Sequence, residues 1–210
     1  MLFNSLEFIF LFLPIVFVGY YYLLHKRLFQ GAKSLLVAAS LFYYAWWNVN
    51  YLPIILLTLL FNYVVGNILS ASPSNRCISR KVILVFSISL NLLLLGYYKY
   101  TDFLIENINF FTHIPIDSID LVLPLAISFF TFQQIAYLID CYKREADEYD
   151  FLNYALFVTF FPQLIAGPIV HHKEMMPQFD ENRNYRWDAE NFAVGLSIFA
   201  LGLAKKVLLA

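Results

Sequence analysis

Residues 34–75 contain no Asp, Glu, Lys, Arg or His at all. A bilayer core about 30 Å thick is crossed by roughly 20 apolar residues in a helix, so this stretch is long enough for two crossings. Asn48, Asn50 and Pro53 predict the turn between them. With 14% charged and 60% apolar residues, the chain cannot coat a soluble domain, which is typically about 25% charged, and it is too apolar for disorder.

Further apolar stretches follow the same length rule, at residues 8–24, 82–98, 121–139, 151–170 and 191–204. We therefore predict an all-α, polytopic transmembrane helix bundle of about six to seven membrane segments, forming one membrane domain over residues 1–210. The first stretch has no basic region before it and no small-residue cleavage site after it. It is predicted to be a retained helix, because a signal peptide needs both features.

The distribution of charge predicts which loops face the cytoplasm. Loops that are predicted to be cytoplasmic carry Lys26, Arg27, Lys33, Arg76, Arg80, Lys81, Lys143 and Arg144. The uncharged turn at 48–51 and the acidic loop at 101–120 are predicted to lie outside, together with the N-terminus. Aromatic groups at 20–22, 43–47 and 97–100 lie near predicted helix ends, and we interpret them as interfacial belts.

The stretch 121–139 carries polar residues on two sides of a predicted helix. At 100° per residue they fall on nearly opposite faces, Pro124, Ser128 and Thr131 on one and Gln133, Tyr137 and Asp140 on the other. Both faces must meet something other than lipid, which predicts a helix inside the bundle. Interhelical hydrogen bonding and a substrate cavity both explain the pattern. Asp140, close to Lys143 and Arg144, is predicted to form a solvated ion pair.

The stretch 151–170 is irregular because it contains Pro162, Gln163, Gly167 and Pro168. Proline removes a backbone donor, and broken backbone at membrane depth is tolerated where protein buries it or where it lines a wet cavity. Two half-helices, a re-entrant loop and a plain helix with a proline kink all fit this pattern. Gln163 is predicted to line the cavity and to bond backbone groups freed by the break.

The titratable residues supply no self-evident catalytic group. His171 and His172 are weak candidates for a general base, and adjacent residues do not form the i, i+4 pair that ligates zinc. Cys77 and Cys141 are predicted to be unpaired thiols, and no bound metal or cofactor is expected. A net charge of −1 does not suggest a nucleic-acid surface. The G-x-S-x-G, Walker A and G-x-G-x-x-G signatures are absent from the sequence.

Two long motifs carry a resemblance to a known family. Residues 123–140 read LPLAISFFTFQQIAYLID and residues 160–169 read FFPQLIAGPI. Together with MLFNSLEFIF at 1–10, FYYAWW at 42–47, PQF at 177–179 and GLAKKVLLA at 202–210, they resemble membrane-bound O-acyltransferases (MBOAT). They are most similar to the bacterial branch of alginate O-acetylation proteins and the D-alanyl-transfer proteins of teichoic acid. The resemblance covers the whole chain in the order of the family.

This resemblance implies a multi-pass enzyme of the bacterial cytoplasmic (inner) membrane. It implies an acyl thioester donor, acetyl-CoA or an acyl carrier, and an acceptor that is an exported polysaccharide such as alginate or an extracytoplasmic partner protein. The substrate funnel would be shaped by Gln133, Tyr137, Gln163, Gly167 and Pro168.

The resemblance assigns no catalytic residue to this sequence. The family's catalytic histidine lies in a second half that no residue here matches, so we expect it beyond Ala210. The chain also stops at Ala210 in the middle of an apolar helical pattern, without a cap or a polar segment after it. We therefore expect the chain to be the N-terminal portion of a longer acyltransferase and to be enzymatically inactive by itself. The alternative is a non-catalytic membrane protein, such as a transporter or channel subunit.

Overall fold

The computed structural model describes residues 3–71, 79–112, 117–119, 121–145, 150–167, 170, 172–180 and 187–208. Regular secondary structure in these ranges is helical, without a strand, which confirms the predicted all-α class. Four segments are long and apolar enough to cross a membrane, namely Phe8–His25, Val49–Ser70, Arg80–Thr112 and Ala189–Leu208. They agree with four of the apolar stretches that the sequence singles out.

The first half of the chain forms an up-and-down row of helices. In chain order they are a π-helical turn η1 (Phe8–Phe12), α1 (Leu13–His25), α2 (Phe29–Trp47), the short 3-10 turn η2 (Val49–Tyr51) and α3 (Leu52–Ser70). The charge-free stretch is thus divided as predicted, because the side chain of Asn48 accepts a bond from the backbone N–H of Asn50 and Pro53 lies in the first turn of α3.

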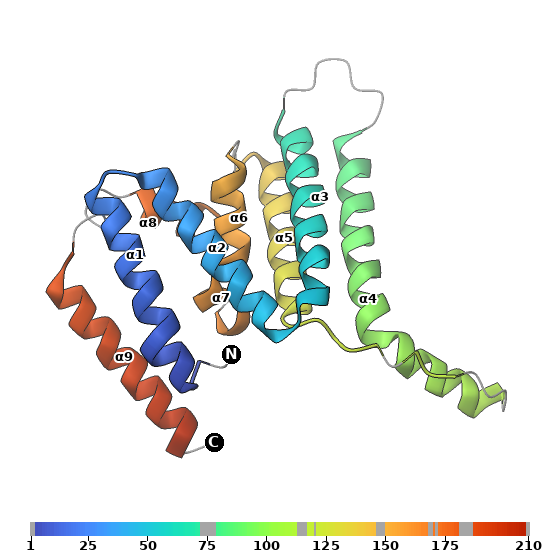
Figure 1. Cartoon of the computed structure of the whole chain (residues 1–210). Coiled ribbons are helices and arrows are strands. Elements are labelled where there is room, and N and C mark those ends of the chain that lie inside the picture. Colours follow the sequence, from blue (N-terminus) through green and yellow to red (C-terminus); the bar gives the residue numbers. More distant parts are fainter. Residues whose placement is uncertain are drawn as a thin grey trace.

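The second half adds the long helix α4 and a set of shorter helices. They are α4 (Arg80–Thr112), α5 (Ile127–Lys143), α6 (Phe151–Thr159), α7 (Phe161–Ala166), α8 (His172–Asp180) and α9 (Ala189–Leu208). Figure 1 shows α3, α4, α5 and α6 side by side, with α2 crossing from α1 towards α3 and with α9 beside α1 at the far edge. The core lies between α2, α3, α5 and α6.

Two predicted boundaries were wrong. The outside loop expected from residue 101 is helical up to Thr112, since Thr101 and Asn107 bond carbonyls of the preceding turn and no breaker intervenes. The helix expected from residue 121 begins at Ile127, because Ala126 adopts a left-handed conformation with φ 56°. Pro124 is therefore not on a helix face.

A buried polar network joins α3, α4 and α5. Asn62 and Asn91 exchange side-chain hydrogen bonds of 3.0 and 2.8 Å. Asn62 also donates to Gln134, whose own amide donates to Thr58 over 3.3 Å. All four side chains are buried. Polar groups in an apolar bundle have no solvent to replace these bonds, so the network fixes the three helices relative to one another.

The two ends of the bundle differ in charge. At one end, Arg80 donates to the carbonyl of Tyr142 over 2.8 Å and Lys33 donates to Asn153 over 2.8 Å. At the opposite end, the Tyr51 hydroxyl donates to the carbonyl of Val122 over 2.6 Å. The carboxylate of Asp102 there accepts from the backbone N–H groups of Ile119 and Leu121. Lys33 and Arg80, near the beginnings of α2 and α4, thus lie at one end and Asp102 at the other, as the charge pattern predicts for these residues. Lys99, late in α4, and Lys205 and Lys206, in the last turn of α9, lie away from this basic end.

Burial corrects three further predictions. Lys33 lies in α2 rather than in a loop, and its side chain is buried against α6 because Asn153 accepts its ammonium. The prediction that Asp140 is solvated was wrong. Its side chain is 2% exposed, since α5 packs against α3, α4 and α6 up to its last turn. Tyr43 and Tyr44 are core residues rather than belt residues, since Tyr43 packs against Phe161 of α7 and Tyr44 lies in the core cluster with Ile55 and Leu59, while Trp46 and Trp47 stay exposed.

We expect Asn62→Ala to lower the free energy of unfolding by about 1–3 kcal/mol, because Asn91 and Gln134 lose a buried partner. The measurement is the unfolding midpoint of the purified protein in detergent. Asn50→Ala, in the exposed turn between α2 and α3, is the matched control and should change stability by less than about 0.5 kcal/mol. Equal effects of the two substitutions would contradict a stabilising network.

Candidate functional site

The irregular stretch is broken into two helices at a single residue. α6 ends at Thr159, Phe160 has ψ 108°, and α7 begins at Phe161 with Pro162 in its first turn. Residues 151–166 are therefore two half-helices and not one helix with a proline kink. Figure 1 shows α8 near the end of α1 and the beginning of α2, at the end of the bundle where α6 also begins. The segment therefore enters the bundle and returns towards the same end.

Two neighbouring helices satisfy the backbone groups that this break sets free. In a continuous helix the N–H of Phe161 would donate to the carbonyl of Phe157. Here that N–H donates to the hydroxyl of Ser40 in α2 over 3.1 Å. The amide of Gln133 in α5 donates to the carbonyl of Phe157 over 2.7 Å. The lost backbone bond is replaced by two bonds from two other helices, and all of these groups are buried.

The structure gives Gln133 a role at the break. Its amide bonds the freed carbonyl of Phe157, and its own carbonyl oxygen has no hydrogen-bond partner among the described residues. Tyr137 is fully buried, with its ring 4.4 Å from that of Tyr154 and close against Gly66. We find Gln133 and Tyr137 inside the packing between helices, and neither lines the cavity described next.

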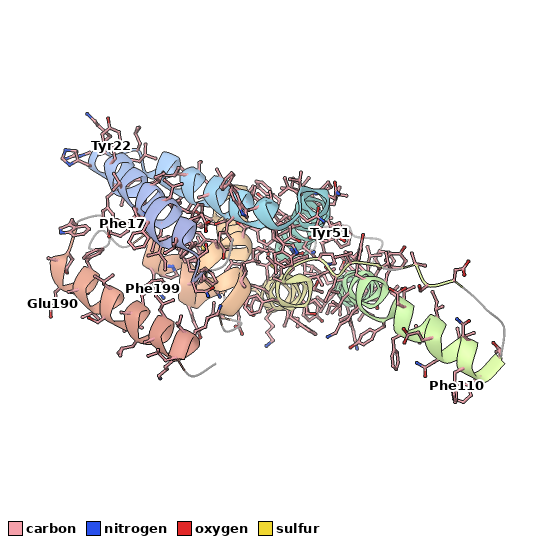
Figure 2. All side chains as sticks on the ribbon, turned by 60° about the horizontal axis from the view of Figure 1, so that its bottom comes forward. Phe17, Tyr22, Tyr51, Phe110, Glu190 and Phe199 are labelled. Atoms are coloured by element: carbon pink, nitrogen blue, oxygen red, sulfur yellow. The ribbon has the colours of Figure 1, made fainter. Side chains whose placement is uncertain are left out.

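A cavity of about 950 Å³ lies between η1, α1, α7, α8 and α9. Apolar side chains form much of its wall, including Leu13, Phe17, Phe160 and Phe199. Polar groups enter the lining from α7, α8 and α9 as Gln163, Glu174, Gln178 and Asn191. Phe17 and Phe199 are labelled in Figure 2, on α1 and α9 respectively. An apolar cavity with a few polar groups is the usual form of a small-molecule site.

Gln163, on the half-helix α7, is among the residues that line this cavity. Gly167 follows the last residue of α7 and lies against Gln163. Its N–H donates to the Gln163 carbonyl over 2.9 Å, and a Cβ at residue 167 would lie 2.6 Å from Cγ of Gln163 and 2.8 Å from its Cα. Only glycine allows this approach, so Gly167 positions Gln163 without itself lining the cavity.

The remaining predicted site residues lie outside the described part. Pro168 and His171 are not described, and His172 begins α8 but its side chain is not described. Cys77 is likewise not described, while Cys141 is buried. Among the described residues no group of three or more His, Cys, Asp and Glu residues could hold a metal ion.

The expectation attached to Ala210 also falls outside the described residues. α9 is described as far as Leu208, and the two residues after it, Leu209 and Ala210, are not. The placement of the catalytic histidine beyond Ala210 therefore stays a prediction.

Several residues of this site were missed by sequence reasoning. Ser40, Glu174, Gln178 and Asn191 carry polar groups at the break or in the cavity wall. Ser40 was accessible to the same argument that singled out Gln163, because it is a polar residue in a charge-free stretch. The others lie in or beside α8 and α9, where mixed polarity resembles an ordinary loop or helix end.

Replacing the serine that accepts from Phe161 tests the repair of the break. Ser40→Ala leaves a buried N–H without an acceptor and should cost about 1–3 kcal/mol of unfolding free energy. Ser197→Ala is the matched control, because Ser197 makes the same bond to the preceding turn on the exposed helix α9. That control should stay within about 0.5 kcal/mol of wild type. Thermal unfolding in detergent measures both variants.

A methyl group at residue 167 tests the position of Gln163. We expect Gly167→Ala to lower stability by about 1–3 kcal/mol, since the Cβ would overlap with Gln163. Gly195 also lines the cavity, but a Cβ added there would have nothing within 4 Å. Gly195→Ala should therefore be neutral or stabilising by up to about 1 kcal/mol. A neutral Gly167→Ala, measured by the same thermal unfolding, would show that the close approach is not required.

Proteins named as O-acetyltransferases or O-acetylases are similar to this chain over its whole length. A peptidoglycan O-acetyltransferase of Helicobacter pylori is 45% identical over 238 aligned residues, covering 100% of this chain and 44% of that protein. Proteins named probable alginate O-acetylase AlgI, from Pseudomonas aeruginosa and Azotobacter vinelandii, are 37% and 35% identical; this chain is covered completely, and they are covered to 40% and 42%. No solved structure matches.

The chain spans about two fifths of the length of these relatives. The profile of MBOAT, the membrane-bound O-acyltransferase family, matches residues 41–210. That match contains α3, α4, α5 and the broken segment that carries Gln163. The chain therefore belongs to the membrane-bound O-acyltransferase family.

Proposed function

We propose that this chain is the part of a membrane-embedded O-acyltransferase that binds and positions substrate. The observation that carries the proposal is the cavity beside the break, into which α7 presents the carboxamide of Gln163, in a chain of this family. Broken helices also occur in transporters, and membership of the family is what favours acyl transfer here.

The reaction that we propose for the whole enzyme is acyl transfer from a thioester to a hydroxyl. A general base takes the proton of the acceptor hydroxyl, the oxygen forms a bond to the acyl carbon, and the carbon–sulfur bond breaks, releasing the thiol. We propose that this base is a histidine in the part of the relatives that this chain does not cover, as the family resemblance implies. Gln163 can donate to a carbonyl oxygen and accept from a hydroxyl, so it suits either substrate.

For the substrates we propose an acetyl group, carried by acetyl-CoA or an acyl carrier, and an exported cell-surface polysaccharide. The acceptor is acetylated directly or through an extracytoplasmic partner protein. Names of the relatives divide between peptidoglycan and alginate, so both polymers belong in the test. We assign the end of the bundle with Lys33, Arg80 and Arg144 to the cytoplasm of the inner membrane, which puts the N-terminus outside.

Substitution of Gln163 in the complete enzyme tests the role of the cavity. Loss of one hydrogen bond to substrate, worth about 0.5–1.5 kcal/mol, predicts a roughly 2- to 10-fold lower kcat/KM for Gln163→Ala. The measurement is transfer of radiolabelled acetyl to peptidoglycan or alginate in membranes with equal amounts of enzyme. Gln30→Ala, at an exposed position of α2, is the control. Wild-type transfer by Gln163→Ala would refute the cavity role, whereas an inactive wild-type enzyme would refute acyl transfer itself.

A further inference from the structure

The end of α4 extends well beyond what a membrane crossing needs. α4 has 33 residues, which at 1.5 Å each is about 50 Å, against a bilayer core of about 30 Å. The surplus is residues 101–112, beyond Lys99 and the exposed Tyr97 and Tyr100. Figure 1 shows this part of α4 turning away from the axis of the bundle, at the end of α4 remote from Arg80.

Residues 101–112 form an amphipathic helix. At 100° per residue, one side collects large apolar residues that are 45–77% exposed, and we call it the outer apolar face: Phe103, Leu104, Ile108, Phe110 and Phe111. Asn107 falls within this face, but its amide is satisfied by donating to the carbonyl of Phe103 over 2.6 Å. The opposite side carries Thr101, Asp102, Glu106, Asn109 and Thr112.

The polar side of residues 101–112 already contacts another part of the chain. The carboxylate of Asp102 accepts from the N–H groups of Ile119 and Leu121 over 3.1 and 3.0 Å, which holds the chain leading to α5 against that side. Figure 2 labels Phe110 at the far end of α4, where its side chain points away from the rest of the bundle. The outer apolar face is therefore turned away from the one described segment that α4 holds here.

We propose that residues 101–112 lie along the extracytoplasmic surface of the membrane that the chain spans. The outer apolar face is buried there in the boundary between headgroups and acyl chains. The occupant is lipid, because the face continues the exposed apolar side of the crossing part of α4, where Phe86 and Leu93 are 64% and 69% exposed. An interfacial helix buries its apolar face about 5–10 Å into that boundary. Its polar side carries Asp102 and Glu106, so the contact depends on apolar area and not on anionic lipid.

Spin labels on the two sides of the helix test this orientation in the full chain, reconstituted in phosphatidylcholine bilayers. In a background with Cys77→Ser and Cys141→Ala, labels are attached to Phe103→Cys and Phe110→Cys, and to Glu106→Cys and Asn109→Cys as matched controls. We expect several-fold higher ratios of oxygen to nickel-chelate collisions at 103 and 110 than at 106 and 109. Raising the salt concentration should leave the ratios unchanged.

Two outcomes would overturn the proposal. High nickel-chelate access at all four positions would mean that the segment projects into water, and low access to both reagents at 103 and 110 would mean that protein covers the face. A second variant avoids the cysteine background: Phe110→Trp should add fluorescence that lipids brominated near the headgroup quench strongly. Unquenched added fluorescence would contradict lipid contact by itself.

Discussion

The arrangement around the candidate site depends on one missing backbone hydrogen bond. Between Phe157 and Phe161 the helix ladder is interrupted, and the two orphaned groups are taken up by Ser40 from α2 and Gln133 from α5. In a hydrocarbon environment neither group could remain unpaired without a cost of several kcal/mol. The break is therefore possible only where α2, α5 and α6 meet, and this meeting point sets where Gln163 emerges.

A second set of buried polar contacts fixes the helices around that meeting point relative to one another. Helix packing in membranes gains little from the hydrophobic effect, because lipid tails are as apolar as the helix surfaces. The network of Asn62, Asn91 and Gln134 supplies directional bonds instead, and the ring of Tyr137 fits the space left by Gly66. α5 is bonded to α3 through Gln134 and to α6 through Gln133, and α4 is bonded to α3 through Asn91. α5 therefore links this network to the broken segment.

Sequence reasoning predicted the membrane class and the turn after α2, and it singled out Pro162 as the place where the helix is broken or kinked. Each of these follows from a local signal, either the absence of charge or a residue that cannot continue a helix. It did not predict the bond from Gln133 to Phe157 and misjudged Lys33, Tyr43 and Asp140, because these depend on which residues the fold brings into contact. Such partners are 24 residues away for Gln133 and 120 for Lys33, beyond any local pattern.

The excess length of α4 affects how the protein can respond to a change in bilayer thickness, because its helices are held together by buried hydrogen bonds. A rigid helix longer than the hydrocarbon thickness must tilt or deform the bilayer, and mismatch of this kind costs a fraction of a kcal/mol per Å. In α4 the excess lies beyond the turn away from the bundle axis, at the end remote from Asn91. A thicker or thinner bilayer can be accommodated by moving that bend along the membrane normal. With residues 101–112 on the membrane surface as proposed, a change in thickness would be taken up at this bend, without tilting the part of α4 that carries Asn91.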